Sequence, residues 1–344
     1  MPEILPNPLD SLPCELSSLA VELAKVTKIS GGRLLLVGGS VRDIYLGSSP
    51  SEIDCEVQGL SIDQLKSTLS KNYTCHEVGK AFGVLKLRNL PVELSLPRTE
   101  IKTGTGHKGF SVDIDPHLPF ERSVQRRDFT INAIGLDPLT CELLDPTGGI
   151  SDIERCLLRH IGPAFSEDPL RVLRAMQFIA RFNLNIYPQT LSLCKSISME
   201  NLPPERLFEE WKKLLIKGNN LSAGLNFLKD CYWLKYFPEL HALVGCKQEP
   251  EWHPEGDVWV HTLHCMDAFA RERTGDSWED LVVGFAVLCH DLGKPMTTVI
   301  GEDGRIRSPL HEPRGEQPTR AFLSRLSNQV ELHEQVVPLV RRHL

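Results

Sequence analysis

The chain has 344 residues, a formal net charge of −7 and 41% hydrophobic residues, which is the composition of an ordinary globular protein of two or three domains. No apolar run approaches the roughly 20 residues that cross a bilayer, and the first residues lack the basic and apolar regions of a secretory signal. The ten cysteines form no C-x-x-C pair, which favours reduced thiols in a cytoplasmic protein. The acidic balance argues against a general polyanion binder but is compatible with a local basic groove.

The first 150 residues are predicted to alternate strands and helices around one sheet. A helix is expected over 11–30, and the apolar run 34–37 is typical of a buried strand that ends at two glycines. A helix start follows at 41–46. Further strands are expected at 53–57, 82–87 and 92–96, with a helix at 61–70.

From about residue 150 the pattern is helical, with Pro and Gly at the joins. Helices are expected at 167–182, 204–217, 221–230, 259–273, 278–290, 317–326 and 330–342. The fold class is therefore predicted as α+β, with an α+β head followed by an all-α remainder. The last helix runs straight into the end of the chain, which leaves open whether the chain is naturally short or is a piece of a longer protein.

The turn at Gly38 and Gly39 joins the buried strand to the helix start. Glycines allow a ligand to approach the backbone closely, and a helix N-terminus offers N–H groups to an anion. The turn is therefore a candidate phosphate site, with Arg42 one turn into the helix. The plain alternative is a tight turn with a surface salt bridge between Arg42 and Asp43.

Two carboxylates, Asp54 and Glu56, are separated by one residue in the predicted strand 53–57. Residues i and i+2 of a strand share a face, so the two acids repel each other unless a cation lies between them. They form either the polar face of an exposed edge strand or a ligand pair for Mg²⁺ in two-metal phosphoryl transfer. Glu93, on another predicted strand, either joins them as a third acid or faces solvent.

A basic pair followed by an acid, Arg126, Arg127 and Asp128, precedes a mostly apolar segment that contains Asn132. The alternatives are a surface charge cluster and a helix start packed under a ligand. The small residues around Asn132 favour the helix start.

A second charged pattern places Asp168, Arg171 and Arg174 at i, i+3 and i+6 of the predicted helix 167–182, which Ser166 is expected to cap. Any amphipathic helix has a charged face, so the pattern is compatible with a solvated surface. It is also compatible with a rigid face that offers donors and acceptors to the Watson–Crick edge of a base.

In this order and spacing, GGSVRD, D-x-E, RRDFTINA, EDPLRVLRA and PPERLFEE resemble the class II tRNA nucleotidyltransferase and bacterial poly(A) polymerase family, over roughly residues 33–240. The resemblance implies a head related to the DNA polymerase beta palm at 1–157. It implies a helical neck that recognises the base at 158–220 and a helical body at 221–344. The implied activity is template-independent addition of C, C and A to tRNA 3′ ends from CTP and ATP. Some members add only CC, only A or poly(A).

The resemblance also implies roles for single residues. Gly38, Gly39 and Arg42 would hold the triphosphate, and Asp54 and Glu56 would hold two Mg²⁺ ions. Glu93 is a further candidate catalytic acid beside them. Most members have Asp at both positions of the pair, so Glu56 is a departure. The positions expected near the sugar and triphosphate are Arg126, Arg127, Asp128 and Asn132. Those expected to read the base are Asp168 and Arg171, with Arg174 beside them, braced by Glu205, Arg206 and Glu210.

The segment 102–121 lies where the family has a flexible loop that we expect to switch base specificity. Its glycines, Gly104, Gly106 and Gly109, would permit movement. The sequence does not indicate between which bases the switch acts.

Near the C-terminus, VWVHTLHCMDAF and VLCHDLGKP resemble the HD phosphohydrolase signature. The residues that carry this resemblance are His261, His290 and Asp291, and His311 with Glu312 is placed where a further ligand could come. A second divalent metal is therefore expected, if the site assembles. The HD pattern needs a later Asp, but the chain stops after His343, which favours a structural remnant.

The leading hypothesis is an enzyme that adds nucleotides to the 3′ end of tRNA, with ATP and CTP as substrates and no membrane partner. Partial addition and poly(A) addition stay open within this class. The other classes are an HD-dependent phosphohydrolase and a non-catalytic RNA-binding module.

Overall fold

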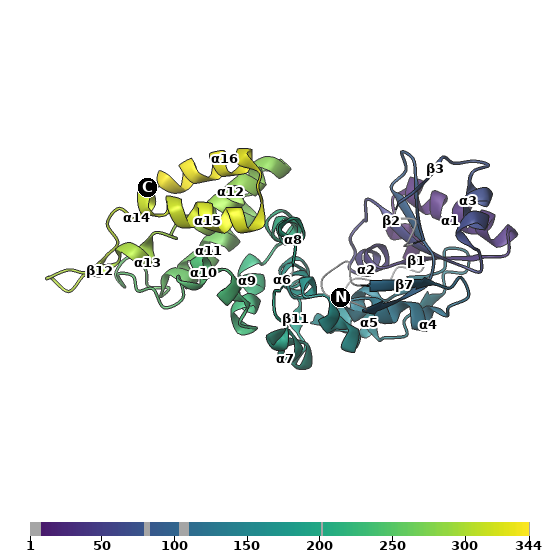
Figure 1. Ribbon diagram of the computed structural model, residues 1–344, viewed down its shortest axis with the longest axis horizontal. Coiled ribbons are helices and arrows are strands. Elements are labelled where there is room, and N and C mark those ends of the chain that lie inside the picture. The colour runs from purple at the N-terminus through teal and green to yellow at the C-terminus, as the bar shows by residue number, and fades with distance from the viewer. Residues whose placement is uncertain (1–7, 79–82, 103–109, 201, 344) are drawn as a thin grey trace. The chain divides into compact units, whose positions relative to one another are not determined.

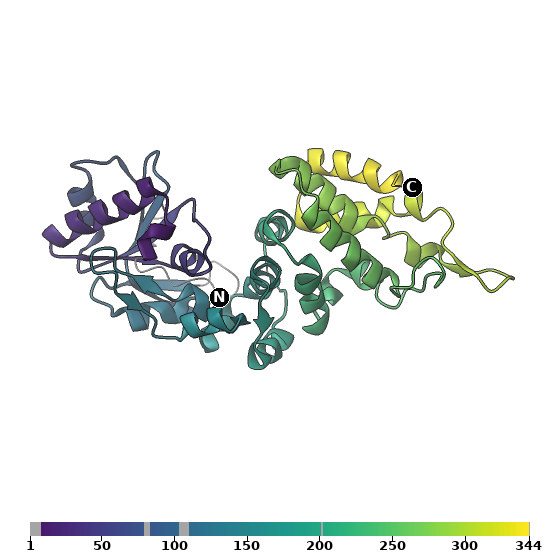
Figure 2. The same ribbon diagram turned by 180° about the vertical axis from the view of Figure 1, so that it is seen from behind.

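The computed structural model describes residues 8–78, 83–102, 110–200 and 202–343. The chain divides into two compact units, 1–168 and 169–344, shown from opposite sides in Figures 1 and 2. The first unit thus extends beyond the boundary predicted at 157. The division inside the helical part at 220 stays a prediction. Within the described ranges, no helix is both long and apolar enough to cross a membrane.

A mixed sheet forms the centre of the first unit, with the strand order β3-β4-β5-β2-β1-β8-β9 among the described residues. β2 runs parallel to β5, and the other neighbouring pairs with a described register are antiparallel. The strands are β1 (Arg33–Val37), β2 (Ile53–Gln58), β3 (Cys75–Glu77), β4 (Val84–Leu87), β5 (Val92–Ser95), β8 (Gly135–Leu136) and β9 (Leu143–Leu144). The predicted strands at 34–37, 53–57, 82–87 and 92–96 are all present.

A separate antiparallel hairpin pairs β6 (Arg98–Lys102) with β7 (Phe110–Ile114). The predicted flexible segment 102–121 is therefore partly regular, since β7 and the start of α4 lie inside it. Gly104, Gly106 and Gly109 lie outside the described residues.

The helices of the first unit pack on this sheet. They are η1 (Pro8–Ser11), α1 (Cys14–Ile29), α2 (Gly39–Tyr45), α3 (Ile62–Leu69), α4 (Phe120–Ser123), η3 (Val124–Arg126), η4 (Thr130–Asn132), α5 (Gly149–Glu154) and η5 (Pro163–Glu167); the short strand β10 is Leu157–Leu158. A capping box starts α3, because Ser61 accepts from the backbone of Gln64 while the Gln64 side chain accepts from the backbone of Ser61.

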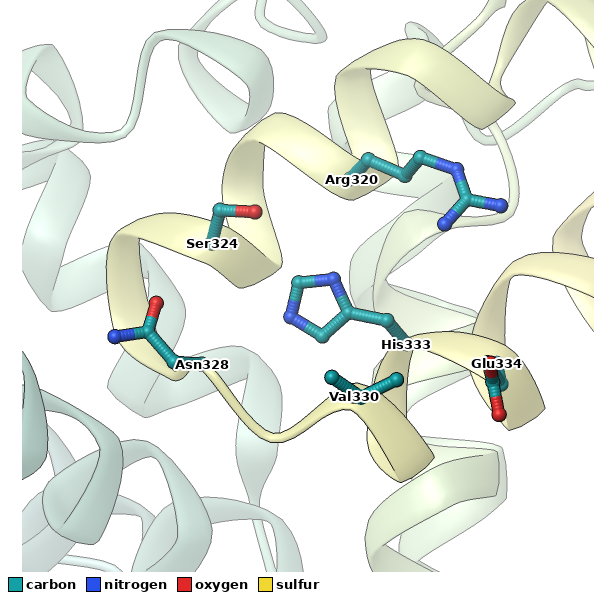
Figure 3. A pocket seen from close by; sticks show the side chains of 6 residues that line it. All are labelled: Arg320, Ser324, Asn328, Val330, His333 and Glu334. Carbon is teal, nitrogen blue, oxygen red and sulfur yellow. The ribbon is translucent and has the colours of Figure 1, made fainter.

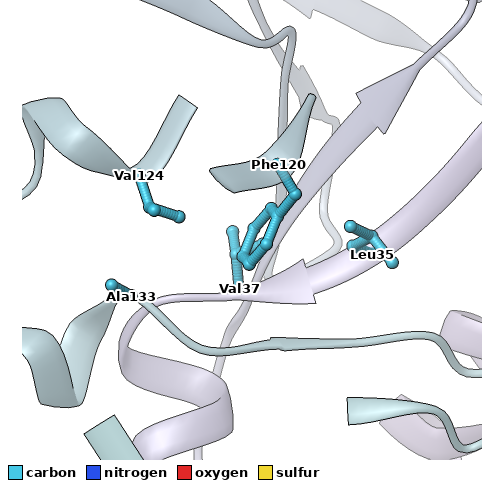
Figure 4. Packing of buried hydrophobic residues seen from close by; sticks show 5 residues of the cluster. All are labelled: Leu35, Val37, Phe120, Val124 and Ala133. Carbon is cyan, nitrogen blue, oxygen red and sulfur yellow. The ribbon is translucent and has the colours of Figure 1, made fainter. Parts of the chain in front are cut away.

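The sheet and α4 share a buried apolar cluster, shown in Figure 4. Leu35 and Val37 of β1 contact Phe120, Val124 and Ala133 there. Gly135 has no side chain for a packing reason, because a Cβ at that position would lie 2.8 Å from the Phe120 ring. The cluster fixes α4, and with it the residues that follow Phe120, against the sheet.

The second unit is almost entirely helical. Its elements are α6 (Leu170–Phe182), β11 (Asn185–Ile186), α7 (Pro188–Ser196), α8 (Pro204–Lys217), α9 (Leu221–Asp230), η6 (Trp233–Tyr236), α10 (Pro238–His241), α11 (Val258–Arg271), α12 (Ser277–Cys289), α13 (Lys294–Thr297), β12 (Val299–Ile300), β13 (Ile306–Arg307), α14 (His311–Arg314), α15 (Glu316–Leu326) and α16 (Val330–Arg341). In Figures 1 and 2, α11, α12, α15 and α16 lie side by side. The α+β class with a helical second part is confirmed.

Aromatic packing and two polar clamps stabilise this helical unit. Trp211 of α8 packs edge-on against Phe237 and Phe322. Arg273 donates to the carbonyls of Leu215 and Gly218 at the end of α8. In Figure 3 the ring of His333 lies in a hollow of about 310 Å³ between α15 and α16, where its Nε2 donates to the carbonyl of Ser327 at 3.0 Å.

The helix predicted from residue 167 begins later. α6 starts at Leu170 after Pro169, without a side-chain cap, and Ser166 instead donates to the carbonyl of Pro163. Asp168 has φ −118° and ψ 102°, because a residue before proline is sterically excluded from the helical region. Asp168 is thus not on the helix that carries Arg171 and Arg174.

Candidate functional site

The glycine turn lets other groups approach its backbone closely. Gly38 has φ +69° and immediately precedes α2, a backbone conformation that favours glycine. A Cβ at Gly38 would lie 2.9 Å from Nη1 of Arg127 and 3.8 Å from Oδ2 of Asp54. The turn, a cationic side chain and a carboxylate therefore meet at one edge of the sheet.

Acidic side chains gather at this edge. Asp54 is exposed on β2 and lies opposite Glu93 of the parallel strand β5. The pKa of Asp54 is raised to about 6, first because neighbouring atoms desolvate the carboxyl and then because Glu93 and Glu52 repel its charge, while Arg127 opposes the shift. A cation bound among these carboxylates would reduce the repulsion between their negative charges. Of the two alternatives for Glu93, the structure places it beside Asp54, where it also pairs with Lys86 at 3.1 Å.

Glu52 was missed by the sequence reasoning. It is exposed, precedes β2 and acts electrostatically on Asp54. The signal was available, because Glu52 and Asp54 have the same i, i+2 spacing as Asp54 and Glu56. The pattern of a strand alone does not indicate at which end the acids reach solvent.

Glu56 lies in a different environment from the one expected. It is fully buried, and the hydroxyl of Ser123 lies 2.9 and 3.0 Å from its two carboxylate oxygens. The two acids proposed as a ligand pair therefore lie in different environments, because α4 covers Glu56 whereas Asp54 reaches solvent. Sequence reasoning also missed Ser123, which no motif marks.

A half-buried arginine, Arg126, lies near Glu56. The pKa of Arg126 is lowered to about 9, first by desolvation and then by the charges of Arg127 and Arg98, while Glu100 and Glu56 oppose the shift. Nη1 of Arg126 lies 3.3 Å from Oε1 of Glu100. Glu56 is thus part of the negative charge that offsets this guanidinium.

A second polar network lies beside the turn. Nη1 of Arg42 donates to Asn132 Oδ1 at 2.6 Å, and Nδ2 of Asn132 donates to Asp128 Oδ1 at 2.9 Å. All three residues are buried. Nε and Nη2 of Arg42 also donate to Asp43 at 2.9 and 2.7 Å. The predicted residues Arg42, Asp128 and Asn132 are thus brought together. The ion pair between Arg42 and Asp43, expected for a simple surface turn, is also present, but the side chain of Arg42 is buried.

On the second unit, α6 and α8 share a carboxylate. Glu210 of α8 is buried, and its Oε1 lies 2.8 Å from Nζ of Lys213 and 3.9 Å from Nη1 of Arg174. The guanidinium of Arg174 also lies 5.3 Å from the ring centre of Phe178. Glu210 therefore contacts the helix that it was expected to brace. Arg171 is on the same helix, and Glu205 and Arg206 are in the first turn of α8.

A second site assembles entirely within the helical unit, around the buried Asp291, which is 1% exposed. Four imidazoles turn Nε2 towards its carboxylate, and we name these residues with Asp291 the imidazole cluster. The distances to Oδ2 are 3.1 Å from His290 and 3.8 Å from His261, and those to Oδ1 are 3.4 Å from His311 and 3.9 Å from His343. The predicted HD residues His261, His290 and Asp291 do converge, together with His311, and His343 also faces this carboxylate.

The other ring nitrogen of each histidine is already bonded. Nδ1 donates to Glu255 from His261 at 2.8 Å, and to the carbonyls of Val287, Ser308 and Val340 from the other three rings at 2.7–2.8 Å. This arrangement fixes the tautomer and leaves the Nε2 lone pair for a metal. Burial lowers the pKa of His261 and His343, which keeps both rings neutral.

The centre of the cluster holds a buried carboxylate, Asp291. Neither oxygen of Asp291 has a well-aligned hydrogen bond, although Nζ of Lys294 lies 2.8 Å from Oδ2. Burial opposes ionisation of this carboxyl, but His290 and Lys294 outweigh it and lower its pKa. Nitrogen and carboxylate donors at this spacing fit a transition-metal ion or Zn²⁺.

Sequence reasoning also missed the residues that support the cluster. Glu255 accepts from His253 at 2.9 Å as well as from His261, and its pKa is lowered to about 2 because these bonds outweigh its desolvation. His253 and Glu255 lie in the segment HPEG, which reads only as a break between helices. His343 was visible only as the last histidine before the chain ends.

Comparisons with known proteins identify the family of the chain. Residues 34–159 match the Poly A polymerase head domain, and residues 183–244 match the probable RNA and SrmB-binding site of polymerase A. The Multifunctional CCA protein of Stenotrophomonas maltophilia strain K279a is 41% identical over 321 residues, which cover 91% of this chain and 76% of that protein. The Multifunctional CCA protein of Xanthomonas campestris pv. campestris strain B100 is 40% identical over 320 residues, covering 91% and 75%.

Solved structures show the same fold. The CCA-adding enzyme of Thermotoga maritima complexed with tRNA has a TM-score of 0.61 at 20% identity, covering 95% of this chain and 70% of that one. A CCA-adding enzyme in complex with CTP has a TM-score of 0.62 at 19% identity, covering 97% and 80%. The resemblance noted in the sequence is confirmed, and the chain belongs to the family of the multifunctional CCA proteins, which are tRNA nucleotidyltransferases.

Proposed function

We propose that this chain transfers CMP and AMP from CTP and ATP to the 3′ end of tRNA, completing or repairing the CCA sequence. The observation that carries the proposal is the meeting of Asp54, Glu93, Arg127 and the turn at Gly38 on one sheet edge. The names of the relatives support the substrate class. Partial CC or A addition and poly(A) addition are the alternatives within the same chemistry.

The chemistry follows from what these side chains can do. Asp54, with Glu93 and Glu52 beside it, supplies the hard oxygen donors that suit Mg²⁺. Two Mg²⁺ ions bound there with the nucleotide would lower the pKa of the attacking 3′-hydroxyl and stabilise the leaving pyrophosphate. The backbone after Gly38 and the guanidinium of Arg127 are placed to hold the triphosphate.

In this proposal, several residues beside the site support it without binding the metal ions. Glu56 is assigned as a buried anchor and not as a metal ligand, because it is fully buried and its carboxylate accepts a hydrogen bond from Ser123. The buried network of Arg42, Asn132 and Asp128 supports the turn from beneath. Arg126 lies in the adjacent buried charge network, and Gly39 opens α2.

Base selection is assigned to Asp168, Arg171 and Arg174. An arginine fork and a carboxylate can satisfy both C and A, which each present an exocyclic amine next to a ring acceptor. The contact of Arg174 with Glu210 supports this assignment, because a charged neighbour that restricts the arginine lowers the entropy cost of binding a base.

The test measures incorporation of labelled CTP and ATP, each alone and together with Mg²⁺. The RNAs are a tRNA lacking CCA, a tRNA ending in CC and an unrelated RNA. We expect C and A addition to the first, A addition to the second and little to the third. Asp54→Ala should abolish incorporation, whereas Asp63→Ala, an exposed acid in the first turn of α3, should not. Full activity in Asp54→Ala would refute the site, and tRNA binding without any incorporation would favour the RNA-binding module.

The imidazole cluster supports a second activity, a metal-dependent phosphohydrolase. The convergence of four Nε2 atoms on a buried carboxylate favours it. A bound metal ion would supply an activated water for attack at phosphorus, and Lys294 would contribute positive charge near a phosphate. The test is phosphate release from 2′,3′-cyclic and 2′-phosphorylated nucleotides. His290→Ala should lose it while Asp54→Ala keeps it; equal loss in both variants would contradict a separate site.

A cytoplasmic location is part of the same proposal. All ten cysteines are free thiols, as expected for a protein kept in a reducing compartment.

A further inference from the structure

Cys265 lies beside the imidazole cluster and has no role in either proposed activity. It is four residues after His261 on α11, so the two side chains share one face of the helix. The Cys265 sulfur lies 3.4 Å from Nε2 of His261, the nitrogen that faces Asp291. The potential ligand atoms of His261, Cys265 and His290 all lie within 4.8 Å of one another.

These spacings match the edges of a tetrahedral metal site. With Zn–S near 2.3 Å and Zn–N near 2.0–2.1 Å, a sulfur and a nitrogen ligand lie about 3.5 Å apart, and two N or O ligands lie about 3.4 Å apart. The observed separations are 3.4 Å from sulfur to His261, 3.8 Å from His261 to Asp291 Oδ2 and 3.1 Å from His290 to the same oxygen. Both imidazoles thus lie close to Asp291, and His261 also lies close to Cys265, so an ion bound by the two imidazoles lies near both remaining ligands.

A second observation points independently to a ligand here. Asp291 is 1% exposed and neither of its oxygens has a well-aligned hydrogen bond. The histidines on either side of Oδ2 donate through Nδ1 to Glu255 and to the carbonyl of Val287. Their Nε2 atoms face the buried carboxylate, an arrangement that a bound metal cation stabilises.

We propose that the Cys265 thiolate is a ligand of the metal ion in the imidazole cluster, together with His261, His290 and Asp291. The metal–sulfur bond forms as the thiol proton is released to solvent, so the site carries one more negative charge than a nitrogen and oxygen site. Thiolate favours borderline and soft ions, so Cys265 selects Zn²⁺ or Co²⁺ over Mg²⁺. The inference rests on the proposed metal centre but not on turnover of any substrate.

The bland alternative is a simple hydrogen bond from the Cys265 thiol to His261. It predicts that an ion in the cluster is bound by nitrogen and oxygen alone. The two alternatives differ in the electronic spectrum of a bound cobalt ion, because only a thiolate ligand produces a sulfur-to-cobalt charge-transfer band.

The experiment titrates the metal-free full chain with Co²⁺ and records the near-ultraviolet and visible spectra. We expect the charge-transfer band in the unchanged chain and in Cys246→Ser, the matched control for a half-buried cysteine of the same unit. Cys265→Ser should lose the band, keep the visible bands of histidine-bound Co²⁺, and bind Zn²⁺ at least about tenfold more weakly in competition with a chromophoric chelator.

Each of the other outcomes refutes a specific part of the proposal. If the unchanged chain binds Co²⁺ without the band, or if the band survives in Cys265→Ser, the thiolate ligand is refuted while the metal centre stands. If the chain binds no Co²⁺, the centre itself fails, and with it the proposed hydrolase. Unfolding of Cys265→Ser is detected by its circular dichroism, and Cys265→Ala then serves as the second variant.

Discussion

Replacing Ser123 by alanine tests whether Glu56 is a buried anchor. The Ser123 hydroxyl contacts both oxygens of this fully buried carboxylate, at 2.9 and 3.0 Å. A hydrogen bond to a charged group contributes about 1.5–3 kcal/mol, and a buried acceptor that loses its partner costs a similar amount. We therefore expect Ser123→Ala to lower the free energy of unfolding of the first unit by about 2–3 kcal/mol.

The assay is thermal unfolding of the full chain by calorimetry, in which the two compact units can be followed separately. A loss of this size should lower the Tm of the first unit by roughly 4–10 °C and leave that of the helical unit unchanged. Ser49→Ala, at an exposed position in the turn after α2, is the control and should shift neither transition by more than about 1 °C.

Two results would refute the reasoning. A Tm of Ser123→Ala equal to that of Ser49→Ala would show that the contact with Glu56 contributes nothing. A Glu56→Gln variant that loses all nucleotide incorporation while its Tm stays the same or rises would show that Glu56 is a metal ligand after all. Under the proposal, Glu56→Gln lowers the Tm and keeps measurable incorporation.

The other predictions concern the site edge and the helical unit. The pKa of Asp54 in the metal-free folded chain is raised to about 6. Between about pH 4 and 6 the folded chain therefore keeps a proton on Asp54 that the unfolded chain has lost. The stability of the folded chain consequently falls as the pH rises through this window. Asp54→Asn should therefore raise the Tm in EDTA at pH 8 but not at pH 4; a gain at both pH values would contradict the linkage. Gly38→Ala places a Cβ at φ +69° and 2.9 Å from Arg127. It should lower the free energy of unfolding in urea by about 1–3 kcal/mol and raise the KM for CTP. The control is Gly39→Ala, whose Cβ makes only ordinary contacts and which should unfold at nearly the same urea concentration as the unchanged chain. Arg273→Ala removes the donors to the carbonyls at the end of α8 and should lower the Tm of the helical unit alone by several degrees; no shift in calorimetry would show that water replaces these bonds.

Much of the fold is encoded locally. The bounds of α8 and α9, Pro204–Lys217 and Leu221–Asp230, are those predicted from periodicity. Apolar residues recur at helical spacing in both, proline and glycine mark the ends of α8, and Asn220 caps the start of α9. The glycine turn, Asp54 and the HD residues were likewise recognisable, since their chemistry is carried by adjacent residues. The short strand β7 was missed because it follows Gly104, Gly106 and Gly109 and was assigned to a flexible loop. The start of α6 was placed too early because Pro169 excludes its neighbour from the helix.

What the tertiary structure decided is which of these groups are exposed and which meet. Alternation along β2 places Glu52, Asp54 and Glu56 on one face, but only the packing of α4 determines that Glu56 is buried against Ser123 while the other two acids reach solvent. In the same way, no local pattern brings His343 to Asp291 across the helical unit. A sequence carries periodicity and chemistry within a few residues, whereas burial and long-range pairing depend on segments that become neighbours only when the chain folds.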